Sequence, residues 1–113
     1  MGHAFLSQPY WQDVDYLTAI RRSAPWVKHL HFHDNFGRLD DLSADIPNRR
    51  IFGEADNHMP PGWGRIPLGE TLAILGEAGY GGWVIVELEE YYEDYWEEAL
   101  ANTRALCAPF MRP

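Results

Sequence analysis

The 113-residue chain has one cysteine, no long apolar run and no signal-like start. Cys107 has no second cysteine with which to form an internal disulfide, which favours a reducing compartment. No apolar run approaches the roughly 18 residues that a membrane-spanning helix requires. The N-terminus lacks a basic segment followed by an apolar core, so no secretory signal peptide is expected. Together these absences predict a cytoplasmic protein that does not cross a membrane.

Basic residues are also scarce. The chain has 9 Lys and Arg residues against 17 Asp and Glu residues, which gives a formal net charge of −8. Proteins that bind nucleic acids usually present a basic surface to the phosphate backbone, so a nucleic-acid partner is not expected. An acidic chain still accommodates a divalent metal ion, because such an ion can be the largest positive charge in its surroundings.

The chain does contain enough apolar sequence for one small α/β domain. Hydrophobic residues make up 46% of it, so a core can be buried. The periodicity of the apolar residues predicts strands that alternate with helices. The expected elements are an extended segment at 1–6, helices at 12–23, 69–78 and 93–107, strands at 26–33 and 83–88, and a long connection at 34–66. This alternation is typical of parallel strands with helices outside them.

Two or three strands cannot close a barrel or cover both faces of a parallel sheet. We therefore expect the chain to be part of a larger α/β unit, or to associate so that its sheet is covered. Connections longer than about 12–15 residues are uncommon unless they carry function. The segment 34–66 is therefore a place to look for site residues.

Three histidines alternate along the expected strand at 26–33. Successive strand side chains point to opposite faces. The polar face therefore holds His29, His31 and His33, and the other face holds Leu30 and Phe32. A strand with one polar and one apolar face is typical of the wall of a pocket.

The C-terminal ends of the two expected strands carry a histidine and a carboxylate, His31 and Glu87. In parallel α/β barrels, the catalytic groups lie at this end of the strands. Imidazole together with carboxylate suits Zn, Mn, Co or Mg ions, depending on how many oxygen ligands complete the coordination. The alternative is that Glu87 marks the solvent-exposed end of its strand.

The long connection adds further candidates. Asp56 and His58 flank Asn57 and could chelate one ion, and the alternative is an Asx-type turn ahead of Pro60. Arg38 follows the histidine strand and could bind a carboxylate, a hydroxyl group or a phosphate, and the alternative is a solvated charge. The spacing alone leaves these alternatives open.

Five short motifs follow one another along the chain. They are Gly2-His3-Ala4, His31-Phe32-His33-Asp34-Asn35, Asp56-Asn57-His58 with Gly62-Trp63-Gly64, Gly79-Tyr80-Gly81-Gly82, and Glu87 at a strand end. In this order they resemble the C-terminal part of the xylose-isomerase-like TIM-barrel superfamily. That group contains sugar phosphate isomerases and epimerases and the endonuclease IV type of DNA-repair enzyme. The resemblance covers nearly the whole chain.

The resemblance implies an α/β fold that is the C-terminal portion of a (β/α)8 TIM barrel. Residues 1–113 would then form a single partial barrel segment, from the tail of the sixth strand to the eighth helix. That segment contains about three parallel strands with outer helices. A family barrel needs roughly 250 residues, and the Asp of the family's Asp-x-x-His motif would fall before Met1. We therefore expect a fragment that lacks the N-terminal strands and is not active alone.

The resemblance also assigns roles to residues. It implies that His31 and Glu87 bind a central divalent metal ion, with Mn, Mg, Co or Zn as candidates. Glu87 is further implied in proton transfer beside the carbon that loses its proton. The residues implied for an additional metal or substrate-contacting site are His3, Asp56 and His58, and the implied substrate contacts are His33 and Arg38.

The implied function is that of a divalent-metal-dependent isomerase or epimerase acting on a sugar or a sugar phosphate. The expected partners are this small-molecule substrate and either the missing barrel strands or a second copy of the chain that covers the sheet. One alternative is an endonuclease IV-like nuclease that acts at abasic sites. Another is a non-catalytic barrel remnant that acts as an assembly module.

Overall fold

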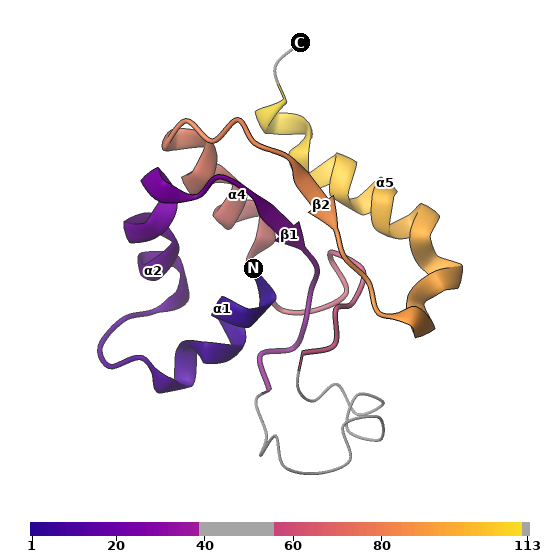
Figure 1. Cartoon of the computed structure of the whole chain (residues 1–113), viewed down its shortest axis with the longest axis horizontal. Helices are drawn as coiled ribbons and strands as arrows, with labels where there is room; N and C mark the ends of the chain where they lie inside the picture. The colour runs from indigo at the N-terminus through magenta and orange to yellow at the C-terminus, as the bar shows by residue number, and fades with distance from the viewer. Residues whose placement is uncertain (39–55, 112–113) are drawn as a thin grey trace.

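The structure, a computed structural model, describes residues 1–38 and 56–111 and confirms the expected α/β class. The helices are α1 (Gly2–Ser7), α2 (Tyr16–Ser23), α4 (Leu68–Glu77) and α5 (Trp96–Cys107), and the strands are β1 (Leu30–Phe32) and β2 (Val84–Val86) (Figure 1). Short 3₁₀ helices adjoin them at Gln8–Tyr10, Ala24–Trp26, Glu90–Tyr95 and Ala108–Phe110. Part of the long connection predicted at 34–66 lies outside the described residues.

The two strands pair in parallel. Their register places Leu30 opposite Val84, His31 opposite Ile85 and Phe32 opposite Val86. Helix α4 lies in the connection between them, as a parallel crossover requires. Strand β1 is shorter than the predicted 26–33. The first predicted residue lies instead in the 3₁₀ helix Ala24–Trp26, whose early position suits Pro25 because proline fixes its own φ and lacks an N–H donor.

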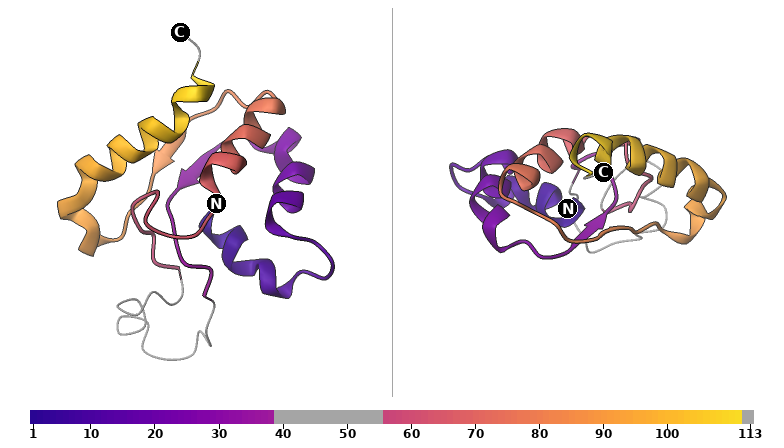
Figure 2. Two further views of the ribbon diagram at one scale, coloured as in Figure 1. Left: turned by 180° about the vertical axis from the view of Figure 1, so that it is seen from behind. Right: turned by 90° about the horizontal axis from the view of Figure 1, so that it is seen from above.

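Among the described residues, helices cover one face of this sheet and leave the other open. The right panel of Figure 2 shows α4 and α5 in a layer on one side of the strands. Leu30 and Phe32 face this layer and pack into a core of Tyr16, Ala24, Ile66, Leu68, Leu72, Ile74 and Leu75. On the opposite face the His31 side chain is 52% exposed and Ile85 is 41% exposed. The predicted division of β1 into an apolar and a polar face is therefore confirmed.

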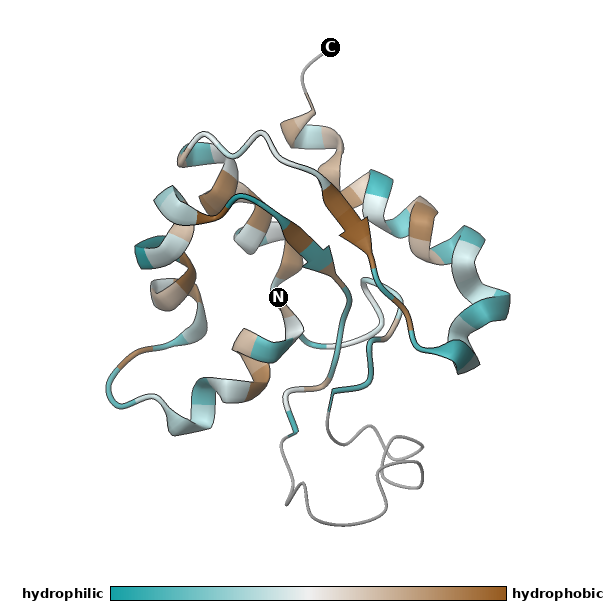
Figure 3. Cartoon of the chain, viewed as in Figure 1, coloured by the Kyte–Doolittle hydropathy of each residue, from teal (hydrophilic) through white to brown (hydrophobic). Residues whose placement is uncertain are grey.

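Strand β2 is apolar along its length, as Figure 3 shows. Val84 packs against the core, whereas Ile85 lies on the open face. Trp83, immediately before β2, is 79% exposed. An exposed apolar sheet face is typical of a surface that another element covers.

The extended segment predicted for residues 1–6 is wrong, because Gly2–Ser7 forms helix α1. The Phe5 N–H donates to the Met1 carbonyl at 3.2 Å, and the Ser7 hydroxyl donates to the His3 carbonyl at 2.7 Å. No residue of this segment is β-branched, so its composition does not favour a strand.

Helix α2 begins at Tyr16, later than the predicted start at residue 12. Asp13 has a φ of 58°, which interrupts the helical conformation before that point. Asp15 then caps the helix, accepting the Thr18 N–H at 2.9 Å and the Thr18 hydroxyl at 2.6 Å. No helix within residues 1–38 and 56–111 has the length and apolar character needed to span a membrane.

Candidate functional site

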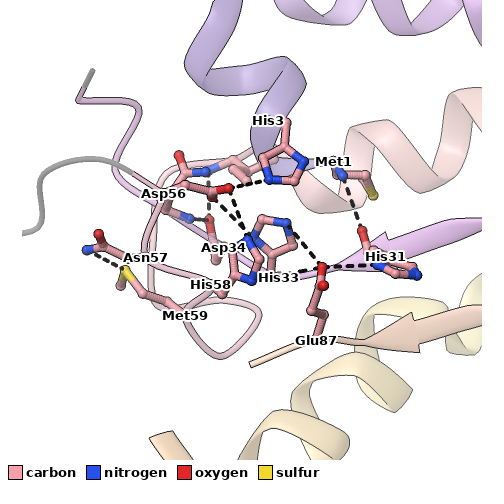
Figure 4. A network of polar contacts seen from close by, with 12 residues as sticks. Met1, His3, His31, His33, Asp34, Asp56, Asn57, His58, Met59 and Glu87 are labelled. Carbon is pink, nitrogen blue, oxygen red and sulfur yellow. Dashed lines mark hydrogen bonds and ion pairs between the residues drawn. The ribbon is translucent and has the colours of Figure 1, made fainter. Parts of the chain in front are cut away.

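Four side chains that can bind a metal ion converge beside the C-terminal end of β1. They are His3 from α1, His33 directly after β1, and Asp56 and His58 from the segment that precedes α4. Their ligand atoms all lie within 4.8 Å of one another. Figure 4 shows these side chains facing one another, although they come from three separate parts of the chain. We call them the four-residue group.

The Asp56 carboxylate lies at the centre of this group. Its Oδ2 is 2.5 Å from His3 Nε2 and 3.0 Å from His58 Nε2. Its Oδ1 is 3.7 Å from His33 Nδ1. The rings of His33 and His58 also lie against each other, with centroids 4.0 Å apart. One carboxylate therefore joins all three imidazoles.

Gly2 allows α1 to bring His3 into the group. A Cβ at this position would overlap the His33 ring and come within 2.8 Å of the Asn35 side-chain nitrogen. His33 is completely buried, so its ring has little room to move aside. The close approach of α1 to β1 therefore depends on the missing side chain of residue 2.

The backbone at His58 adopts an unusual conformation. Its φ of 42° lies in the left-handed region, which residues other than glycine rarely adopt. The next residue, Met59, exchanges backbone hydrogen bonds of 2.9 and 3.0 Å with Asp34. Such conformations persist where surrounding contacts impose them, and they concentrate at functional sites.

Burial gives His33 a strongly shifted pKa. Burial first, and then the charge of nearby His58, lowers the pKa of His33 from 6.5 to about 4. The His33 ring is therefore neutral at pH 7 and keeps a nitrogen lone pair that a metal ion can use. Within the described residues, neither ring nitrogen of His33 has a hydrogen-bond partner, and neither has Asp56 Oδ1. Because buried polar atoms without partners are costly, these atoms fit a site for a divalent cation.

Asp56 and His58 form a coupled pair. The hydrogen bond to Asp56 is the main cause that raises the pKa of His58. Burial alone would raise the pKa of Asp56, but the hydrogen bond and charge of His58, with the charges of His33 and His3, bring it below the ordinary value. A metal ion bound here would displace the proton that His58 readily takes, so its affinity should depend on pH.

Glu87 links the four-residue group to His31. Its N–H donates to the Phe32 carbonyl at 3.2 Å, which continues the pairing of β2 with β1. Its Oε2 lies 3.1 Å from His31 Nδ1 and 3.9 Å from both His33 Nε2 and His58 Nδ1. The Glu87 carboxylate is therefore within reach of both His31 and the group.

The structure brings together some of the metal ligands predicted from the sequence and separates others. His3, Asp56 and His58 meet, as expected for the additional site. His31 lies outside the four-residue group and contacts Glu87. The predicted roles of His31 and Glu87 as ligands of a central metal ion stay predictions.

The two predicted substrate contacts, His33 and Arg38, lie in different surroundings. The His33 side chain lies within the group of possible metal ligands, a role that the sequence reasoning missed. The alternation along β1 placed His33 on the same face as His31, and this was the available signal. Arg38 is exposed at the end of the described segment 1–38.

Comparison with known proteins identifies the family. The family model for the xylose isomerase-like TIM barrel matches residues 1–106. The chain belongs to this family. The match confirms the resemblance read from the five motifs, and the barrel family accounts for parallel strands whose C-terminal ends carry the polar residues.

Three curated relatives illustrate the family. Inosose dehydratase of Bacillus velezensis is 28% identical over 92 residues, covering 79% of this chain and 28% of that protein. Fructoselysine 3-epimerase of Escherichia coli O157:H7 is 32% identical over 87 residues, covering 74% of this chain and 32% of that protein. Inosose isomerase of Halalkalibacterium halodurans is 36% identical over 90 residues, covering 66% of this chain and 32% of that protein. The chain thus spans less than a third of these relatives, and no solved structure matches it.

Proposed function

We propose that the chain forms the C-terminal part of a divalent-metal-dependent enzyme that isomerises or epimerises a sugar or a related polyhydroxylated carbonyl compound. The observation that carries this proposal is the convergence of three imidazoles and one carboxylate, with Glu87 at their edge. The relatives are named for isomerisation, epimerisation and dehydration. For carbonyl compounds, all three reactions can begin with removal of a proton from the carbon beside the carbonyl.

The four-residue group would hold one metal ion, because it already provides four ligands within the described chain. When bound, the ion polarises an oxygen of the substrate. Neutral His33 and ionised Asp56 are in the protonation states that such a site needs at pH 7.

Glu87 is the residue that we assign to proton transfer. Its side chain is 34% exposed, so a substrate on the open face of the sheet can reach it. His31 lies 3.1 Å from its Oε2 and would keep the carboxylate facing that side. His31 and Glu87 would also be ligands of the central metal ion, with further ligands from outside the described residues. Arg38 is proposed to contact the substrate, whereas His33 is completely buried and is assigned to the metal ion of the four-residue group.

The open face of the sheet supports the proposal that further strands complete the site. Ile85 and His31 are exposed there, and an α/β barrel covers this face by closing on itself. The curated relatives are about three times as long as the matched segment. Full activity of this chain therefore depends on strands that lie outside it.

One experiment tests metal binding and proton transfer separately. The protein that carries this chain is stripped with a chelator and reloaded with Mn²⁺, Co²⁺, Zn²⁺ or Mg²⁺, and its bound metal is measured by mass spectrometry. It is then incubated in D₂O with a panel of sugars and inososes, and NMR follows deuterium entering the carbon beside the carbonyl. Protein that retains no metal and exchanges no proton on the whole panel would contradict the proposal.

A matched pair of variants assigns the step to Glu87. Glu87→Gln should keep the ion of the four-residue group, to which Glu87 does not belong, and lose deuterium exchange by roughly 10²–10⁴-fold, the range for a lost general base. Glu70→Gln makes the same change on the exposed side of α4, so it should leave both unchanged. Equal exchange in the two variants would remove Glu87 from the mechanism.

A zinc-dependent nuclease that acts at abasic sites is a second candidate. The specific observation in its favour is the donor set, since three imidazoles with one carboxylate suit zinc. The net charge of −8 weighs against binding to a DNA backbone. Salt-sensitive binding of the protein to an abasic duplex, without binding to sugars, would favour this candidate over the isomerase.

A further inference from the structure

The buried residue Asp34 attaches the segment that supplies Asp56 and His58 to the end of β1. Asp34 follows His33 and is 1% exposed. Its N–H donates to the Met59 carbonyl at 2.9 Å, and its carbonyl accepts the Met59 N–H at 3.0 Å. This reciprocal pairing fixes the backbone one residue after His58.

The side chain of Asp34 fixes the rest of the same segment. Its Oδ2 accepts the N–H groups of Gly62 at 3.0 Å and Gly64 at 2.9 Å. Its Oδ1 accepts the N–H groups of Ile66 at 3.1 Å and Asn35 at 2.9 Å. Each oxygen already accepts two hydrogen bonds, so Asp34 is not arranged to act as a metal ligand or a base.

The glycines of this turn are placed to suit the carboxylate. Gly62 has a φ of 93°, a conformation that side chains other than hydrogen rarely tolerate. A Cβ on Gly64 would overlap both the Asp34 carboxylate and the Asn35 carbonyl oxygen. The spacing Gly-x-Gly therefore lets two backbone donors, one on each side of Trp63, reach one oxygen atom.

We propose that Asp34 is a positioning residue of the candidate site, which acts through segment 56–66 to hold His58 against His33. The proposal concerns the site on which the proposed function rests. The geometry itself can be tested without a metal ion, because the two ring centroids lie 4.0 Å apart in the structure as it stands. A residue that only stabilised the core would leave this contact intact in any variant that stays folded.

The first measurement uses NMR on the whole 113-residue chain. Asp34→Asn replaces an oxygen acceptor by an NH₂ group that must face backbone N–H donors. We expect the amides of Gly62, Gly64 and Ile66 to exchange with solvent at least about tenfold faster, and the ring contact between His58 and His33 to disappear. The amide of Tyr80, bonded to the Leu75 carbonyl at 2.9 Å, should keep its protection and show that the fold persists.

The second measurement uses Co²⁺ as a probe of the four-residue group. The visible absorption of bound Co²⁺ should change and its affinity fall by at least about tenfold in Asp34→Asn, the size of effect seen when a supporting residue is removed. Asp15→Asn is the matched control, since Asp15 also accepts a backbone N–H, at 2.9 Å, but on α2. This control should bind Co²⁺ as the unchanged chain does.

The outcomes separate the two proposals. If the unchanged chain binds no Co²⁺, the metal proposal fails, and the ring contact still decides the role of Asp34. Preserved turn amides and an intact ring contact in Asp34→Asn would overturn the positioning role. If Asp34→Asn unfolds, Gly64→Ala decides instead, because its Cβ overlaps the Asp34 carboxylate and should break the same ring contact.

Discussion

The position of α1 can be tested by adding one methyl group. Gly2→Ala places a Cβ where the buried His33 ring lies, so either the ring or α1 must move. Overpacking of a close-packed interior costs about 1–3 kcal/mol. If metal binding requires α1 to stay in this position, this cost lowers the metal affinity of the four-residue group. At about 1.4 kcal/mol for each factor of ten, the loss is roughly 5- to 150-fold. The loss arises because His3 leaves the four-residue group when α1 shifts.

Gly69→Ala provides the control for this change. Gly69 lies in α4, and a Cβ added there meets no atom within 4 Å. This substitution should leave metal affinity unchanged and slightly stabilise the helix, because alanine is favoured over glycine by about 1 kcal/mol. The assay is a Co²⁺ titration followed by absorption, together with thermal unfolding of both variants. Equal Co²⁺ affinity in Gly2→Ala and Gly69→Ala would refute the inference that α1 docking delivers His3.

Four further outcomes follow from the same geometry. The folded chain holds His33 at a pKa of about 4 instead of 6.5, so the unfolded chain takes up the proton first. The contribution of neutral His33 to the free energy of unfolding is therefore complete above pH 6.5 and is lost as the pH falls toward 4, by up to about 3 kcal/mol. Urea unfolding of the unchanged chain and of His33→Gln at pH 7 and pH 4 measures this loss. Asp56→Asn should lower the pKa of His58, because the hydrogen bond that raises it is weakened, and an NMR titration of the His58 ring would show no change if that bond does not exist. Cobalt affinity should fall as the pH is lowered, since protons compete for the same imidazoles, and a flat pH profile would contradict binding at this group. Phe32→Ala should lower the free energy of unfolding by about 3–5 kcal/mol, because Phe32 is completely buried. A much smaller decrease, measured by urea denaturation, would contradict its place in the core.

Local patterns in the sequence were enough to predict much of the fold. The alternation of His31 with Leu30 and Phe32 predicted the two faces of β1, and the leucine spacing at 69–78 predicted α4 within one residue at each end. These predictions hold because side-chain period and burial are local properties of a strand or helix. The extended segment at 1–6 was predicted wrongly, because it was read as the end of a strand although its residues favour no strand.

The composition of the site depended on contacts between distant residues. Sequence motifs named His3, Asp56 and His58, but the position of His33 among them requires α1 to lie against β1. That approach depends on Gly2, whose importance is visible only when the His33 ring is seen beside it. Asp34 was likewise read as part of a motif, although its side chain organises a turn that begins 28 residues later.

The turn at Gly62–Ile66 has a consequence for the charge of the substrate. Glycine-rich turns often bind phosphate, because their N–H groups point to a common centre. Here the N–H groups of Gly62, Gly64 and Ile66 converge on the carboxylate of Asp34, which occupies that centre with its own negative charge. Because these three N–H groups already donate to Asp34, they cannot bind a phosphoryl group. A phosphorylated sugar would need other cationic partners, and an uncharged sugar would need none at this turn.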